Sequence, residues 1–197
     1  GITSPAGPFS YSYRAGVGDD YQDPENPDAQ SAGSLLQRIG LPSGAFVTNL
    51  FDVYGRLTST VLKNSGNVNV DGHSYEVNVG NQRTRQTRWD ASFVDYSYDD
   101  GGQVKSALGY ESGGTTNRWL ERFFYSYDAS GNLSNRVQNT LTNVFNVNNL
   151  NELTSLVRTN SSLTVAGVTY GAATNVTITT NGVATVATRY ADFTYAL

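Results

Sequence analysis

The chain of 197 residues is 38% hydrophobic and only 15% charged, and it contains 13 Tyr, 8 Phe and 20 Gly. This balance is typical of aromatic β-strands separated by turns, and it excludes disorder of the whole chain. The net charge of −4 argues against a nucleic-acid partner bound through its phosphates, and the absence of cysteine excludes thiolate catalysis, Cys-ligated zinc and disulfides.

The first 45 residues are interpreted as a decayed repeat with an exposed acidic insertion. Tyr11-Ser12-Tyr13 begins the repeat pattern described below, but Arg14 stands where Asp is expected. Clustered acids and two prolines predict an exposed insertion over residues 16–34. No metal or cofactor is predicted, because the spacing of the acids does not match a helix-flanked calcium loop. The weak calcium candidates are Asp19, Asp20 and Asp23, with Glu25 and Asp28 nearby.

The run Ser34–Ile39 is the best short candidate for a helix, but it serves equally well as a strand. No run approaches the roughly 18 consecutive apolar residues of a membrane span. The chain begins at Gly1 without Met or a charged and apolar leader, so we interpret it as a processed product or an excised fragment.

Residues 46–158 contain a repeated unit of aromatic, any residue, aromatic, Asp, two residues, Gly, polar and aliphatic. Two copies agree position by position, YSYDDGGQV at Tyr96–Val104 and YSYDASGNL at Tyr125–Leu133, and a third at Phe51–Leu57 lacks the first aromatic. Weaker copies at Tyr75–Arg83 and Phe145–Leu153 have Asn where Asp and Gly stood. The copies recur at intervals of 20 to 29 residues, which predicts one two-stranded hairpin per unit with loops of variable length between units.

The repeated residues have a physical reason at a chain reversal. The Asp carboxylate can accept backbone N–H groups two or three residues on, and Gly three positions later adopts a positive φ at low steric cost. Asn is the next most tolerant residue for that geometry. The aliphatic residue two past the Gly begins a return strand, so the unit predicts a hairpin. The predicted turn residues are Asp52, Gly55, Asp99, Gly102, Asp128 and Gly131.

Two further segments are predicted as β-structure. The return strand Arg83–Arg88 has no apolar face, so its Arg and Gln side chains suit a solvent-facing surface or one stacked on tyrosine rings. Residues 159–197 are rich in Thr, Val and Asn and continue the β character without the repeat. Their strand-like runs are Leu163–Val165, Asn175–Thr179 and Arg189–Tyr195.

These motifs resemble the YD repeats of Rhs-type and teneurin-related proteins. The resemblance covers roughly residues 46–158, and it implies an antiparallel sheet of consecutive β-hairpins that forms an open or spiralling strip. It further implies a secreted or cell-surface protein whose strip winds into a shell, which in bacterial members often encloses a toxin. The chain departs from the family in having few repeats and no recognisable shell-closing segment or toxin. Its partners are therefore expected to be neighbouring repeats or other copies, which would cover the open edges.

No enzyme is predicted, because no residue or motif of the sequence supports a catalytic site. His73 is the single histidine, and a surface or strand residue is the simpler interpretation. The repeat aspartates already have a turn role, and no phosphate-binding loop or zinc motif is present.

Two functions remain open at this level. The first is a non-catalytic structural module that builds a shell, stalk or filament outside the cell. The alternative is an adhesin or carbohydrate-binding module with Trp89 and Trp119 as stacking platforms. A glycan or an enclosed polypeptide would then be the ligand, while packing between hairpins is the simpler role for the repeat tyrosines.

Overall fold

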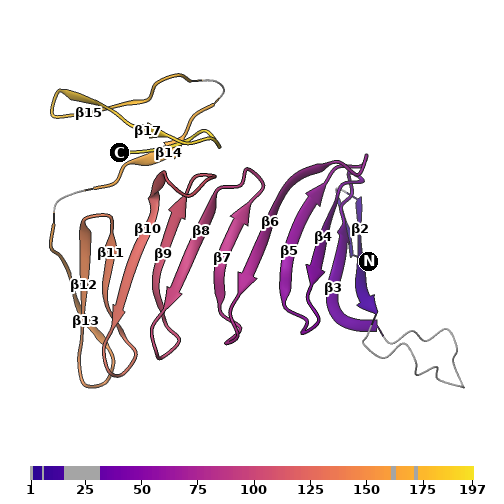
Figure 1. The fold of residues 1–197 in the computed structure, drawn as a ribbon, viewed down its shortest axis with the longest axis horizontal. Coiled ribbons are helices and arrows are strands. Elements are labelled where there is room, and N and C mark those ends of the chain that lie inside the picture. The colour runs from indigo at the N-terminus through magenta and orange to yellow at the C-terminus, as the bar shows by residue number, and fades with distance from the viewer. Residues whose placement is uncertain (1, 6, 16–31, 161–162, 171–172) are drawn as a thin grey trace, which may run out of the picture. The chain divides into compact units, whose positions relative to one another are not determined.

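The computed structural model describes residues 2–5, 7–15, 32–160, 163–170 and 173–197. Within these ranges every regular element is a β-strand, and the first thirteen strands pair with their neighbours in sequence. The predicted all-β fold of consecutive hairpins is thereby confirmed (Figure 1). The chain divides into two compact units, Gly1–Glu76 and Val77–Leu197.

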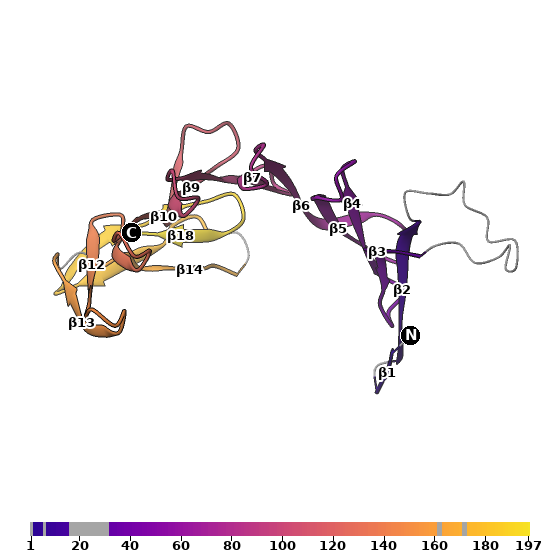
Figure 2. The ribbon, with the colours of Figure 1, turned by 90° about the horizontal axis from the view of Figure 1, so that it is seen from below.

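The first unit is a single layer in which each strand pairs with the next in sequence (Figure 2). Its strands are β1 (Ile2–Ser4), β2 (Gly7–Ala15), β3 (Ala32–Gly40), β4 (Phe46–Phe51), β5 (Leu57–Lys63) and β6 (Asn69–Val77). Residues 34–39 are thus a strand and not a helix. The predicted insertion is wrong for residues 32–34, because β3 begins at Ala32. The calcium candidates Asp19, Asp20 and Asp23 lie outside the described residues.

The second unit continues the same pairing rule and adds two small sheets. Its consecutive antiparallel strands are β7 (Arg83–Arg88), β8 (Phe93–Tyr98), β9 (Val104–Tyr110), β10 (Asn117–Tyr127), β11 (Leu133–Gln138), β12 (Leu141–Val147) and β13 (Leu153–Arg158). The C-terminal segment forms a three-stranded sheet of β14 (Ala166–Val168), β18 (Thr194–Ala196) and β17 (Thr188–Arg189), and a hairpin of β15 (Thr177–Thr180) and β16 (Val183–Val186).

The C-terminal segment differs from its predicted strands at two places. The run 189–195 is not one strand, because the chain reverses between β17 and β18. The Tyr190 N–H donates to the Thr194 carbonyl at 2.9 Å, and Phe193 adopts a φ of 65°. The run 163–165 lies before β14, although Val165 exchanges two backbone hydrogen bonds with Leu197. The sequence did not predict the turn at Phe193, because aromatic residues are rare at a positive φ.

Three connections between one hairpin and the next, at the other ends of the strands from the repeat turns, have the same turn geometry. In each, the first residue donates its N–H to the carbonyl four residues on and accepts from the N–H of the fourth residue, which has a positive φ. The residues at a positive φ are Gly44, Asn67 and Ala91. A longer connection follows Glu111, and a two-residue turn contains Asn139. The repeat intervals differ because these connections differ and because the strands vary in length, from 6 residues in the Arg83–Arg88 strand to 11 in the Asn117–Tyr127 strand.

The sheet layer has almost no interior. The buried apolar residues among those described are Phe46, Val94, Ala187, Tyr190 and Ala196. Side chains cover one another across strands instead. The guanidinium of Arg85 on β7 lies 4.0 Å above the Phe93 ring and forms an ion pair with Asp95, with 2.6 Å between the nearest atoms. The strand Arg83–Arg88 was predicted to face solvent or to stack on tyrosine rings, and Arg85 instead stacks on a phenylalanine, Phe93.

The strained turn at Ala91 gives a test of this backbone geometry. Ala91→Gly removes the left-handed strain on a residue with a φ of 64°, so we expect the free energy of unfolding to rise by about 0.5–1 kcal/mol. Gly102→Ala, at a φ of 83°, should lower it by about 1 kcal/mol or more. Chemical denaturation measures both. A destabilised Ala91→Gly would contradict the assigned turn.

Candidate functional site

The repeat aspartates use their carboxylates to hold the turns. Asp128 Oδ1 accepts hydrogen bonds of 2.9 Å from the N–H groups of Ser130 and Asn132, and Asp52 Oδ1 accepts from Tyr54 and Arg56 at the same distance. Asp99 Oδ1 accepts from the Gln103 N–H at 2.9 Å. The glycines Gly55, Gly102 and Gly131 have φ values of 76°, 83° and 85°. Each carboxylate therefore closes the turn around its glycine.

Asparagine makes the same turn in the two weaker repeats. Asn78 Oδ1 accepts from the Gln82 N–H at 2.9 Å, and Asn148 Oδ1 accepts from the N–H groups of Leu150 and Glu152. Asn81 and Asn151 stand in place of the glycines, both at a φ of 61°. An amide oxygen can replace the carboxylate here because the backbone donors are unchanged.

In three repeats the polar residue after the glycine position connects its turn to the next one, whereas Arg56 and Glu152 bond Asp52 and Asn148 within their own turns. Gln82 Nε2 donates to the Gly102 carbonyl at 3.3 Å, and Gln103 Nε2 donates to the Gly131 carbonyl at 3.2 Å. Asn132 Nδ2 makes the equivalent bond to Asn151 Oδ1 at 2.9 Å. These bonds run along one rim of the sheet in the second unit. The sequence showed a polar residue at this position but gave no reason for it.

The second tyrosine of the repeat links its unit to the one before. The Tyr98 hydroxyl donates to the Arg83 carbonyl at 2.7 Å, and the Tyr127 hydroxyl donates to the Val104 carbonyl at 3.0 Å. Each acceptor is the first residue of the preceding return strand. Burial raises the pKa of Tyr127, which favours the neutral hydroxyl that donates. The tyrosine is thus a connector between hairpins.

A buried arginine anchors the C-terminal segment to the end of β9 and β10. Arg118 is only 1% exposed. Its guanidinium bonds Glu111 at 2.5 Å, Asp192 at 2.7 Å and the Thr194 hydroxyl at 3.0 Å, and it lies over the Tyr190 ring. Burial alone would lower the pKa of Arg118, but the hydrogen bond to Asp192 and the charge of Glu121 raise it. The guanidinium therefore stays charged.

Further contacts complete this anchor. The Trp119 N–H donates to the Tyr190 hydroxyl at 2.7 Å, and the Ala191 N–H donates to Glu111 Oε2 at 3.1 Å. Glu121 Oε2 lies 2.9 Å from the Arg88 guanidinium. Gly109 leaves room for Glu121, since an added Cβ would lie 2.5 Å from its Oε2. No sequence motif pointed to Arg118, because its partners are 74 residues or more away at Asp192 and Thr194.

The two tryptophans occupy different surfaces. Trp89 lies in the turn between β7 and β8 and is 55% exposed. Trp119 lies on β10, is 42% exposed and lines a pocket of about 290 Å³. The other lining residues are Asn139, Thr140, Leu163, Thr164, Thr188, Ala196 and Leu197. The two indoles therefore do not form one shared platform in this pocket.

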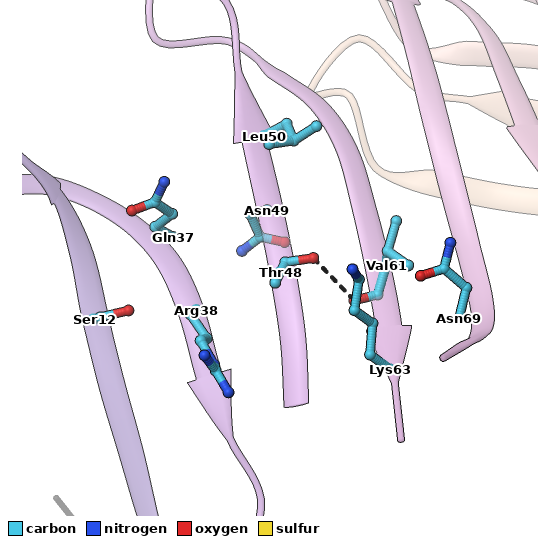
Figure 3. A pocket seen from close by; sticks show the side chains of 9 residues that line it. All are labelled: Ser12, Gln37, Arg38, Thr48, Asn49, Leu50, Val61, Lys63 and Asn69. Atoms are coloured by element: carbon cyan, nitrogen blue, oxygen red, sulfur yellow. Dashed lines mark hydrogen bonds between the residues drawn. The ribbon is translucent and has the colours of Figure 1, made fainter. Parts of the chain in front are cut away.

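A larger groove of about 580 Å³ lies in the first unit, across strands β2 to β6 (Figure 3). Its lining residues are Ser12, Gln37, Arg38, Thr48, Asn49, Leu50, Val61, Lys63 and Asn69. The set contains two cations and no carboxylate. Sequence reasoning did not find this groove, because its residues come from five strands and only Ser12 lies in a repeat motif, the decayed copy at Tyr11-Ser12-Tyr13.

His73 lies within β6, where its ring stacks on Tyr75 with 6.5 Å between centroids. In the part of the chain that the structure describes, no group of three His, Cys, Asp or Glu side chains could hold a metal ion. No helix in those same ranges is long and apolar enough to cross a membrane.

Two solved structures share this fold. No protein-family model and no curated protein matches the chain. The crystal structure of TcdB2-TccC3-TEV matches with a TM-score of 0.54 and 17% identity over 66% of this chain, and the Photorhabdus luminescens Tc holotoxin pore matches with 0.55 and 18% over 71%. The matched region is 6% of each of those chains. At these identities the likeness shows the fold alone, and the fold is found in components of a Tc toxin.

The turn at Asp128 predicts a pH effect on stability. Hydrogen bonds from the Asn132 side chain and backbone hold the pKa of Asp128 below its ordinary value. Since the folded pKa is the lower one, the stabilisation is present above the unfolded value near pH 4 and is lost as the pH falls through the folded pKa. Asp128→Asn should therefore be less stable than wild type at pH 7, with the gap closing below about pH 4.

Urea titrations between pH 2 and 7 measure this difference. Asp100→Asn serves as the matched control, because Asp100 is exposed in the neighbouring turn and makes no hydrogen bond or ion pair with the described residues. It should keep the wild-type pH profile. A constant gap between wild type and Asp128→Asn at every pH would show that the carboxylate charge does not stabilise the turn.

Proposed function

We propose that this chain is a non-catalytic structural module of an extracellular, toxin-related bacterial repeat protein of the YD type. The observation that carries the proposal is the set of bonds between successive repeats, from Gln82 to Gly102, from Gln103 to Gly131 and from Tyr127 to Val104. These bonds tie each hairpin to its neighbour, so the residues that define the repeat serve to extend a sheet. The fold shared with Tc toxin components supports a shell-building role.

The repeat acids support the non-catalytic part of the proposal. The carboxylates of Asp52, Asp99 and Asp128 accept backbone hydrogen bonds within their own turns. A general acid or base must reach a substrate proton, and a carboxylate engaged with its own backbone is poorly placed to do so. Turnover on a glycan panel that vanished on replacing an acid outside these turns would contradict the proposal.

The last strand of the sheet supports association with other repeats or copies. Every residue of β13 is exposed, including Leu153, Leu156 and Val157. One edge of β13 pairs with β12, and no strand of the described chain pairs with its other edge. An exposed apolar edge strand with few charges is a template for another strand. The edge is therefore the proposed contact of the module.

Leu156→Lys tests this contact. We expect wild-type protein to associate as its concentration rises, and the variant to stay monomeric because a charge on the edge opposes pairing. Sedimentation velocity across a concentration series gives the distribution of species. Val183→Lys is the matched control, since Val183 is 65% exposed on β16 and away from the edge. The edge contact would be refuted by wild-type protein that is monomeric at every concentration, or by a control variant that loses association as Leu156→Lys does.

A second candidate function, ligand binding through exposed aromatics, is favoured by the pocket at Trp119. That pocket combines the indole with three threonine hydroxyls and the Asn139 amide, which is the mix of apolar and polar groups found in small-molecule sites. Trp119→Ala should abolish glycan-array binding with the fold unchanged, while Trp89→Ala should not. Unfolding of Trp119→Ala by circular dichroism would instead assign the indole to packing.

A further inference from the structure

The groove of the first unit has two cations on one face of the sheet. Arg38 on β3 stands opposite Thr48 on β4, and Thr48 stands opposite Val61 on β5. Lys63 follows Val61 by two residues, so strand alternation returns it to the same face. Strands are spaced by about 4.8 Å, which places the Arg38 and Lys63 backbones about 10 Å apart across the sheet. Such spacing suits an extended ligand with negative charge along its length.

Neither cation is neutralised by the protein. The Arg38 guanidinium lies 3.8 Å above the Phe46 ring, a stacking that leaves its N–H edge able to bind a carboxylate. Lys63 Nζ donates to Asn67 Oδ1 at 3.2 Å, and an ammonium has two further donors. Neither forms an ion pair within the described ranges. Of the other ring-stacked arginines, Arg56, Arg85 and Arg118 each pair with a carboxylate. Arg122 instead donates to Asn117 Oδ1 at 2.7 Å.

The remaining groove residues favour a sugar over a peptide. Strands β3, β4 and β5 are paired on both edges, so their backbones cannot add an extended peptide as a further strand. Recognition must come from side chains. The Ser12 hydroxyl and the Asn69 amide can each donate and accept, as sugar hydroxyls do. The Thr48 hydroxyl donates to the Val61 carbonyl at 3.5 Å and can accept. Leu50 is 58% exposed and offers an apolar surface to the C–H face of a sugar ring.

We propose that this groove binds an acidic oligosaccharide, with uronate carboxylates held by Arg38 and Lys63. The ligand lies across strands β3 to β5, and its hydroxyls face the polar side chains between the cations. This site is separate from the repeat contacts, so it does not depend on the structural role proposed above. The protein has a net charge of −4, so the rest of its surface disfavours an anionic ligand. The groove is a local basic patch on that surface.

Calorimetric titration of the full chain with galacturonate and mannuronate hexamers tests the proposal. We expect one of them to bind, with an affinity that falls as salt rises, while neutral cellohexaose does not bind. Lys63→Gln should weaken binding several-fold, and Arg38→Gln with Lys63→Gln by about tenfold or more. Because Arg38→Gln also removes the contact with Phe46, Lys63→Gln is the variant that leaves packing intact, and thermal unfolding checks both.

Lys105→Gln is the matched control, since it removes an exposed lysine from β9 in the other unit. It should bind the hexamer as wild type does. The proposal is overturned if neither uronate binds, if Lys63→Gln binds unchanged, or if Lys105→Gln weakens binding as much as Lys63→Gln. Hexaglutamate that bound as tightly as the uronate would also overturn it, in favour of an acidic peptide.

Discussion

The whole sheet depends on one turn geometry, in which up to five backbone and side-chain hydrogen bonds fix a reversal of five residues. A carboxylate or amide oxygen accepts the following N–H groups, and the fourth residue takes a positive φ, as at Asp128 and Gly131. The ladder shifts register just before the turn, between Ser126 and Tyr127 and between Ser97 and Tyr98. Turn and bulge together set which face of the sheet each side chain occupies, because a register slip of one residue would move every side chain of the strand to the other face.

A layer with so little interior must be stabilised laterally. Hydrophobic burial, the main driving force of most domains, is restricted here to a few residues such as Phe46 and Val94. Its place is taken by stacked cations and rings, and by the hydrogen bonds of Tyr98, Gln82 and Gln103 to adjacent hairpins. Neighbouring hairpins are therefore part of what makes each one stable. The last strand, β13, has no further hairpin beside it in the described chain, and its side chains are exposed.

The repeat was readable from the sequence because its turns use residues with strong local preferences. Asp99, Gly102 and their equivalents recur at fixed offsets, and these offsets led to consecutive hairpins. The turn at Ala91 and the C-terminal reversal at Phe193 were not readable, since both residues occupy a positive φ that their residue types disfavour. Arg118 and the groove at Arg38 were missed for another reason. Their contacts join distant strands, and neither burial nor cross-strand register is visible in a single sequence without the ladder.

The rim bonds also bear on how the protein would respond to mechanical force. A load that separates adjacent strands acts on the side-chain bonds and the backbone ladder of one hairpin at a time, because no deep core spreads the load over several strands. Each two-stranded unit of 20 to 29 residues would then lengthen the chain by at most about 70–100 Å as it opens. A strip that extends in discrete, recoverable steps can absorb a sudden mechanical load.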